Sequence, residues 1–247
     1  MRPLLKLAQL HPRFRVKEML KDSTYRLALM AIILGGTLPA HAISPYSATY
    51  TFNLDNKASG TAVRTLSKQG NHWLYDFNAR IPVMATASEK STFSLVNNQV
   101  VSQHYQRQYK ILVHNQTTTM DFNPASKTIQ VQRDKKASQL AWQPGVLDDL
   151  NVEVQLREDL KKGGLKSSYL IADAKDITAR QFVNEGSVKV TTPSGSYDAV
   201  KVRINHHKKD KSTIFWLAPS LDYLPVKVSH SDDGSTYTLD LTRYKPS

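Results

Sequence analysis

The first candidates for chemistry in this sequence are its histidines and carboxylates. The chain has 247 residues and no cysteine, which excludes disulfides, cysteine-ligated metal sites and thiol nucleophiles. A transition metal would then depend on the eight histidines and on carboxylates. His206 and His207 are adjacent, and on a strand they would point to opposite faces, so they could chelate one ion only if the chain loops there. We therefore expect neither a metal nor another cofactor.

His104 and His114 are a second candidate pair, ten residues apart. A hairpin around Gln108 and Tyr109 would bring them opposite each other, whereas one long continuous strand would keep them apart. An envelope hydrolase using His104, His114 or His206 with a carboxylate is one hypothesis for the function. No Gly-x-Ser-x-Gly frame, phosphate loop, His-Glu-x-x-His or dinucleotide fingerprint supports it. We expect no catalytic residues. Whether the protein is an enzyme stays open, and we favour a non-enzymatic role.

The best candidate for contact with anions is a basic loop. It contains His206, His207, Lys208, Lys209 and Lys211. A solvated hairpin loop explains the same residues equally well.

Aromatic residues indicate a binding surface more clearly. The preferred candidates are Tyr50, Phe52, Trp73, Tyr75, Phe77 and Trp216, and Phe93, Tyr105, Phe122 and Phe182 show the same pattern. On a curled sheet they would crowd the concave side and form an apolar groove for an acyl chain or a platform for a sugar. An ordinary filled core is the alternative.

The elements that must position these residues are predominantly strands. Alternation with a period of two runs through Ala48 to Phe52, Trp73 to Asn78, Val200 to Asn205 and Tyr237 to Thr242. Other candidate strands are Gly60 to Ser67, Ser91 to Val96, Val100 to Gln106, Ile111 to Phe122, Thr128 to Gln132, Tyr169 to Asp173, Ala179 to Glu185, Val188 to Thr192 and Thr213 to Leu217. The pattern predicts one all-β domain over residues 43–247, an antiparallel meander that either buries one face or curls around a cavity.

A single helix interrupts the strands. Residues 147–162 place leucine and valine at helical spacing, with Asp148 or Asp149 as the cap and Gly163-Gly164 as the stop. Its single apolar stripe suits a helix that covers an opening or an edge of the sheet.

The N-terminal 42 residues have the pattern of an export signal. An apolar core from Leu27 to Leu38 follows basic residues and precedes Ala40-His41-Ala42, which predicts cleavage after Ala42. If translation starts at Met19, the signal peptide has an ordinary length. The core is shorter than a membrane-spanning helix. Without the signal the formal charge falls from +12 to +7. No nucleic-acid signature accompanies this charge, so we expect no nucleic acid as a partner. Export would direct the charge toward envelope anions, but a merely basic surface exposed to solvent is the preferred explanation.

The C-terminal half resembles a bacterial exported family. The segments are Val190 to Val202 around Pro193-Ser194-Gly195, Phe215 to Pro219 and Leu224 to Val228, and the Gly60 strand and the Leu147 to Leu150 helix start fit as well. These segments are similar to the family called domain of unknown function 3108, over about Tyr46 to Tyr244. The resemblance implies a curved antiparallel sheet, an open or half β-barrel, in a Gram-negative periplasm, and it supplies no catalytic residues.

Three functions are consistent with these observations. The first is a periplasmic binding or envelope-maintenance protein whose concave sheet holds a lipid, another amphiphile or a glycan. The second is the hydrolase, and the third is a scaffold that pairs a sheet edge with an envelope protein. Because a lipid-anchoring cysteine is missing, we expect no stable membrane anchor.

Overall fold

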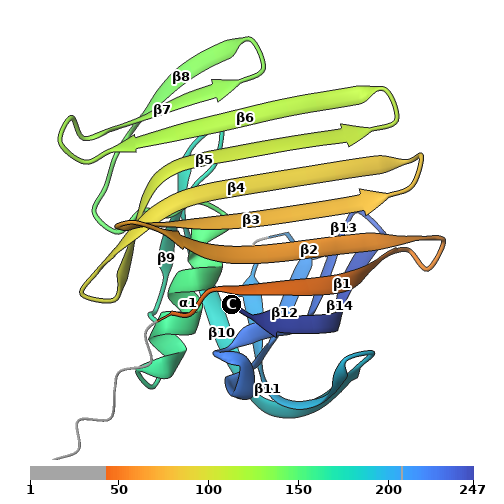
Figure 1. Cartoon of the computed structure of the whole chain (residues 1–247). Helices are drawn as coiled ribbons and strands as arrows, with labels where there is room; N and C mark the ends of the chain where they lie inside the picture. Colours follow the sequence, from red (N-terminus) through yellow and green to blue (C-terminus); the bar gives the residue numbers. More distant parts are fainter. Residues whose placement is uncertain (1–42, 207) are drawn as a thin grey trace, which may run out of the picture. The chain divides into compact units, whose positions relative to one another are not determined.

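The computed structural model describes residues 43–206 and 208–247, which form one 14-stranded antiparallel sheet and one α-helix (Figure 1). The strands are β1 (Tyr46–Leu54), β2 (Ala58–Gln69), β3 (His72–Ile81), β4 (Ala85–Val96), β5 (Gln99–Ile111), β6 (His114–Asn123), β7 (Thr128–Arg133), β8 (Lys136–Ala141), β9 (Tyr169–Ala172), β10 (Ile177–Thr192), β11 (Gly195–Asn205), β12 (Ser212–Ala218), β13 (Leu224–Asp232) and β14 (Ser235–Pro246). The helix α1 is Asn151–Lys161, and a 3₁₀ turn, η1, is Pro219–Leu221. The predicted all-β class with one helix is confirmed.

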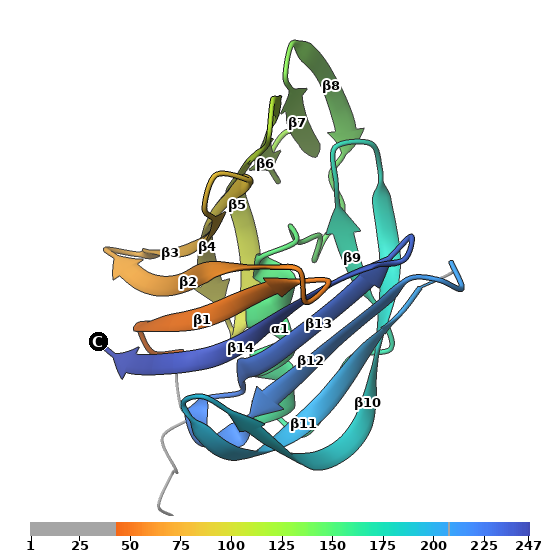
Figure 2. The same cartoon turned by 90° about the vertical axis from the view of Figure 1, so that its right-hand side faces the viewer.

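Neighbours in the sheet are almost all neighbours in the chain. The order is β8-β7-β6-β5-β4-β3-β2-β1-β14-β13-β12-β11-β10-β9, so only the β1–β14 pair joins distant segments. This pair places the two ends of the described chain side by side in the middle of the sheet. The edges are β8 and β9, and the sheet curves until its two halves face each other (Figure 2). The architecture is therefore an open barrel.

Three strand predictions differ from the structure. The Ile111 to Phe122 run contains a turn at residues 112–113, because β5 ends at Ile111 and β6 starts at His114. The two strands expected over residues 179–192 are one strand, β10, which has a register shift between Asn184 and Ser187. Such bulges are typical where a strand bends. Strand β8 was not predicted, because its residues are mostly exposed and show little of the alternation that indicates a strand.

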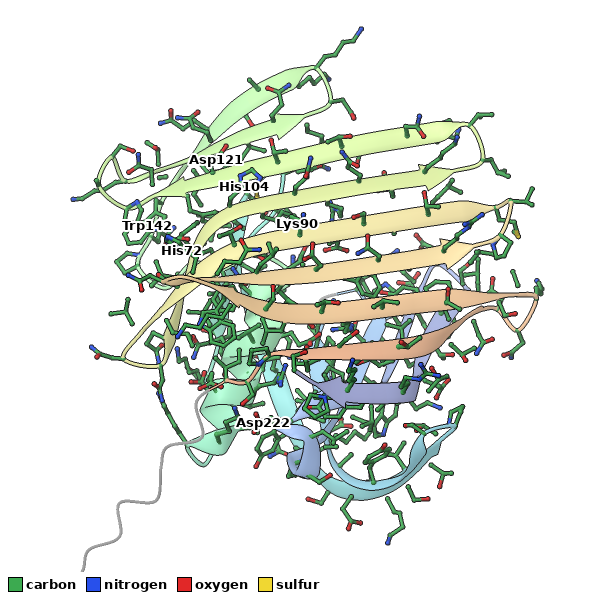
Figure 3. The ribbon with its side chains drawn as sticks, viewed as in Figure 1. His72, Lys90, His104, Asp121, Trp142 and Asp222 are labelled. Carbon is green, nitrogen blue, oxygen red and sulfur yellow. The ribbon has the colours of Figure 1, made fainter. Side chains whose placement is uncertain are left out.

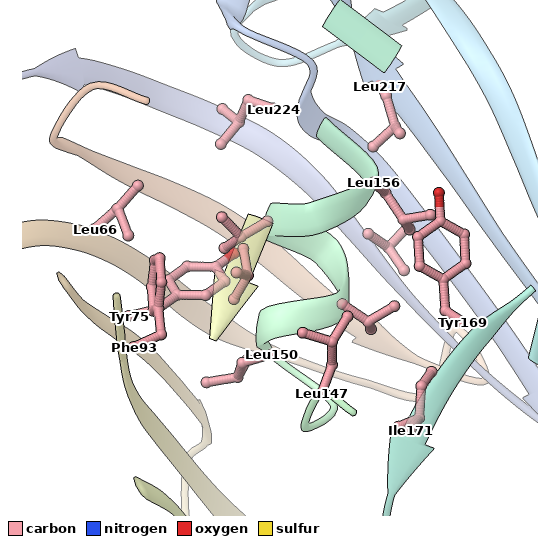
Figure 4. Close-up of a cluster of buried hydrophobic side chains, with 14 of the residues drawn as sticks. Leu66, Tyr75, Phe93, Leu147, Leu150, Leu156, Tyr169, Ile171, Leu217 and Leu224 are labelled. Carbon is pink, nitrogen blue, oxygen red and sulfur yellow. The ribbon is translucent and has the colours of Figure 1, made fainter. Parts of the chain in front are cut away.

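Helix α1 starts later than expected and is buried on all sides. Residues 147–150 are not helical; Leu147 instead makes a parallel bridge with Ile171. Asp148 Oδ1 accepts hydrogen bonds from the backbone N–H groups of Leu150 and Asn151, at 3.0 and 2.9 Å, so Asp148 caps the helix. Residues 151–160 are all buried. The helix lies inside the curved sheet, among the apolar side chains shown in Figure 4.

Polar residues on α1 are buried because the sheet and nearby loops supply their partners. Gln155 accepts a hydrogen bond from the Val100 backbone N–H at 2.7 Å. Arg157 donates from Nη1 to the Tyr46 hydroxyl at 3.1 Å and from Nε to the Asp222 carbonyl at 2.9 Å. The sequence predicted contact along a single apolar stripe, whereas the structure buries this helix on all sides.

The predicted signal peptide, its cleavage after Ala42 and the Met19 start fall outside the described residues. Within residues 43–206 and 208–247, no helix is long and apolar enough to span a bilayer.

Candidate ligand-binding cavity

The concave side of the sheet holds a cavity of about 1050 Å³. Leu150, Val152 and Leu156 of α1 contribute to its lining. The turns between strands surround the other end, where the lining includes Leu54, Met84, Leu112, Arg133, Lys175 and Lys208. Figure 1 shows α1 on the side opposite the β3–β4 and β5–β6 turns. The helix thus closes one end of the cavity, and the turns form its mouth.

Apolar side chains form most of the wall. Phe77, Phe182, Phe215, Val228 and Leu239 line it from five different strands. Phe52 also lines the cavity and stacks on Tyr237, with ring centroids 5.5 Å apart. A mainly apolar wall with a few polar groups is the usual composition of a small-molecule site.

A buried ion pair lies in the wall next to α1. Arg64 points inward from β2 in phase with Ala62 and Leu66, and its guanidinium pairs with the carboxylate of Glu153 on α1. The Tyr75 hydroxyl hydrogen-bonds the same carboxylate and accepts a bond from Arg64 at 2.9 Å. Because these charges satisfy one another, this cluster holds the helix against the sheet.

A second polar cluster lies beside the first. Asp149 bridges Arg107 and Arg180, with N–O distances of 3.5 and 3.1 Å. Glu89, opposite Arg107 in the sheet, accepts a hydrogen bond from the Tyr105 hydroxyl at 2.6 Å. Burial raises the pKa of Glu89, and the Tyr105 hydrogen bond partly opposes this shift. All three guanidinium groups of the two clusters are thus balanced by carboxylates.

The mouth has an excess of positive charge. The whole lining carries eight Lys and Arg residues against four Asp and Glu residues. Arg133 and Lys175 lie at the mouth and make no ion pair with other residues of the described part of the chain. A field of one sign around a partly enclosed opening attracts ligands of the opposite charge.

A polar strip crosses β12 and β13 near the mouth. The Thr213 hydroxyl lies 2.9 Å from Nε2 of His206 and 2.7 Å from Nδ1 of His230. Burial, together with the charge of Lys211, lowers the pKa of both imidazoles. Neutral imidazoles favour hydrogen bonding over ion pairing at neutral pH.

The structure separates the six preferred aromatic residues into three groups. Phe52 and Phe77 line the cavity. Tyr50, Trp73 and Tyr75 lie in the core, where Tyr50 donates a hydrogen bond to the Pro225 carbonyl at 2.9 Å. Trp216 follows the cavity-lining Phe215 and points to the other face of β12, where Lys227 lies 5.9 Å from its ring. Whether any of them contacts a ligand stays a prediction.

Of the predicted anion-facing loop, His206, Lys208 and Lys211 lie at the mouth. Lys209 is exposed outside the lining, and His207 falls outside the described residues. Lys208 pairs with Asp232 at 2.9 Å and with Asp233, and Lys211 pairs with Asp232 at 3.0 Å. These carboxylates neutralise much of the charge of the loop, and its anion contact stays a prediction.

The suggested His104–His114 pairing is wrong. The hairpin turns at residues 112–113 rather than at Gln108 and Tyr109, so His104 lies opposite Asp121, and His114 lies opposite Ile111. His104 Nδ1 is 2.6 Å from Asp121 Oδ1, on an exposed part of the sheet surface (Figure 3). Within residues 43–206 and 208–247, no group of three or more His, Asp or Glu residues could hold a metal ion.

The charged residues of the cavity are the functional candidates that sequence reasoning missed. Arg64 lies in phase with Ala62 and Leu66, and Arg107 lies in phase with Tyr105 and Tyr109. A charged residue in phase with the apolar face of a strand is the signal that would have identified them.

Fold and cavity together define a β-barrel-like protein with an open sheet and an internal cavity closed by a helix at one end. The family described as "Protein of unknown function (DUF3108)" matches residues 45–242, and the chain belongs to this family. This confirms the resemblance seen in the sequence.

A solved structure supports the fold. The chain is similar to a β-barrel-like protein of domain of unknown function DUF1849 from Brucella abortus, with a TM-score of 0.57 and 13% identity. The match covers 83% of this chain and 98% of the other. At this identity the similarity shows the fold alone. A search of curated proteins gives no match.

Proposed function

We propose that this chain is an exported, non-enzymatic binding protein of the bacterial cell envelope, which holds an amphiphile with an anionic head group. The single observation that carries this proposal is the cavity, whose wall is apolar and whose mouth carries unpaired cations. An acyl chain would lie against Phe52, Phe77 and Leu239, and its head group would lie near Arg133 and Lys175. The predicted signal sequence supports a periplasmic location.

An amphiphile fits the lining better than a glycan does. Sugars need many hydroxyl and amide partners and exposed aromatic faces, whereas most uncharged lining side chains here are aliphatic or phenylalanine. The cavity, at about 1050 Å³, is slightly larger than the range of about 300 to 1,000 Å³ that is usual for ligand sites. It therefore has room for a large acyl compound.

The test is identification of bound compounds by native mass spectrometry on protein purified from its own periplasm. A filling variant, Ala87→Trp, puts bulk into the cavity from β4. Thr92→Trp is the matched control, because residue 92 faces away from the buried side chains of Ser91 and Phe93 on the same strand. We expect the wild type and the control to retain an amphiphile and Ala87→Trp to lose it. Empty wild-type protein that also fails to bind fatty acids in vitro would contradict the proposal.

A scaffold function has one observation in its favour. Strand β8 is an edge strand, and five of its six residues are exposed. Such an edge can accept a strand from a partner. Pull-down from envelope extracts with Ala137→Lys/Gln139→Lys, which adds charge to this edge, tests this alternative: loss of a captured protein would support it.

A further inference from the structure

Two neighbouring turns at the cavity mouth expose apolar side chains to solvent. Val83 is 99% exposed in the β3–β4 turn, and Leu112 and Val113 are 64% and 87% exposed in the β5–β6 turn. The turns are adjacent, since Ala85 pairs with Ile111 and the Leu112 N–H donates to the Met84 carbonyl at 2.9 Å. We call residues 82–84 and 111–113 the apolar tip. Most of the large exposed apolar residues in the described part of the chain belong to it.

The backbone conformation at two positions of the apolar tip disfavours the residues found there. Val83 has φ 65° and Leu112 has φ 53°, in the left-handed region that suits glycine, asparagine or aspartate. Asn97, Asp134 and Asp233 occupy such positions in the β4–β5, β7–β8 and β13–β14 turns. A β-branched valine is especially unfavourable there. Because folding alone would favour a polar residue or glycine at these positions, the apolar side chains indicate a function other than stabilising the fold.

The charge around the tip is positive. Arg80 and Lys110 are exposed; Lys110 directly precedes the tip, and Arg80 is two positions before it. Residues 77–88 and 107–120 contain no aspartate or glutamate. Apolar side chains flanked by cations fit the surface of a bilayer with anionic head groups.

The geometry favours a lipid surface over a protein partner. A stable protein interface buries about 800 Å² on each side, with a packed centre, whereas two narrow turns present separate protruding side chains. A bilayer accepts such side chains individually, at the boundary between head groups and acyl chains. We infer that the apolar tip docks this protein on an anionic lipid surface, with the cavity mouth against the bilayer.

This inference extends the proposed function, but the two can be tested separately. Met84 and Leu112 belong both to the tip and to the cavity lining, so the wall continues into the docking surface. Val83 and Val113 lie outside the lining. Replacing these two residues should therefore affect docking without changing the space available to a ligand.

The experiment is vesicle co-sedimentation of the mature protein with phosphatidylethanolamine–phosphatidylglycerol vesicles and with phosphatidylcholine vesicles. We expect wild-type protein to bind the anionic vesicles and Val83→Asn/Val113→Asn to bind them roughly tenfold more weakly or worse, because two apolar side chains no longer enter the bilayer. Val96→Asn is the control: Val96 is 54% exposed and is the last residue of β4, at the end of the strand away from the tip. It should bind as the wild type does.

Folding is checked by thermal unfolding. Asparagine suits the left-handed backbone of residue 83, so the double variant should unfold at the same temperature as the wild type or higher. Equal vesicle binding by wild type and double variant would overturn the inference, as would wild-type protein that does not bind. A protein partner lost from the double variant, without vesicle binding, would also overturn it.

Native mass spectrometry on the same variants separates this result from the proposed function. A retained amphiphile with unchanged vesicle binding would refute docking alone. Tip-dependent vesicle binding by a protein with an empty cavity would support docking and count against the proposed function.

Discussion

Arg64 of β2 and Glu153 of α1 form an ion pair inside the curved sheet, with side-chain exposures of 7% and 6%. The Tyr75 hydroxyl of β3 hydrogen-bonds both residues. Two strands and the helix thus meet at one cluster of charges. Removing one charge from such a pair leaves the other buried without compensation.

We expect Arg64→Met to destabilise the fold by about 3 to 5 kcal/mol, because the Glu153 carboxylate would stay buried without its cation. Adding Glu153→Gln should restore part of this loss, since the amide still accepts from Tyr75 and carries no charge. Urea denaturation of the wild type, both single variants and the double variant gives the coupling energy. Additive losses would contradict a direct pair.

Gly60 lies where β2 and β3 approach closely, and we expect Gly60→Ala to destabilise the protein. A Cβ atom at this position would lie 2.0 Å from the Arg80 backbone carbonyl oxygen, which cannot move without shifting β3. Overpacking of this kind costs about 1 to 3 kcal/mol. Gly164→Ala is the control, because an added Cβ there meets nothing within 4 Å. Equal melting temperatures for the two variants would contradict the prediction.

The buried carboxyl of Asp148 should make the protein less stable as the pH rises. Burial raises the pKa of this helix-capping carboxyl from 3.8 to about 6, against the opposing hydrogen bonds from Asn151, Ser91 and Ser102. Between these values the folded protein keeps a proton that the unfolded chain loses. Stability should therefore fall by up to about 3 kcal/mol from pH 4 to pH 6, at about 1.36 kcal/mol per pKa unit.

Comparison with Asp148→Asn isolates this effect, since the amide oxygen can still cap α1 and does not titrate. The difference between the unfolding free energies of wild type and variant should change over this pH range and stay constant above it. Asp198→Asn, at a side chain that is 83% exposed, should show no such change. A constant difference for Asp148→Asn from pH 4 to pH 7 would count against a raised pKa.

The cations at the mouth predict a salt-dependent preference for anionic amphiphiles. In Arg133→Gln/Lys175→Gln, we expect roughly tenfold weaker binding of a fluorescent fatty acid at low salt, because long-range attraction is lost. Binding of the corresponding neutral alcohol should stay unchanged. Lys189→Gln, at a side chain that is 76% exposed outside the cavity lining, is the control. A uniform loss for both ligands would indicate damage to the cavity instead.

Strand alternation and turn residues predicted most of the meander. Residues typical of turns lie between β13 and β14, at Asp233-Gly234, and between β10 and β11, at Pro193-Ser194. The β5–β6 turn was missed because Leu112 and Val113 are apolar residues in a position where glycine or asparagine is usual. The early start expected for α1 reflects leucine spacing alone. Pairing of Leu147 with Ile171 overrides this local preference.

For the cavity, alternation along a strand predicted on which face of the sheet a side chain lies. It did not predict whether that side chain packs against α1 or lines the cavity. Tyr75 and Phe77 are on the same face of β3, yet Tyr75 contacts α1 and Phe77 lines the cavity. The position of the helix along the strands decides this, and it depends on contacts between distant segments. The pairing of Arg64 with Glu153 was not predicted, because the two residues are 89 positions apart in the chain.

The two edges of the sheet remain unjoined, since β8 and β9 stand at opposite ends of the strand order. In a closed barrel the number of strands and their stagger fix the radius. Here ion pairs link the two halves of the sheet instead, since Asp149 pairs with Arg107 of β5 and with Arg180 of β10. The width of this barrel therefore depends on contacts between side chains rather than on a closed ladder of backbone hydrogen bonds.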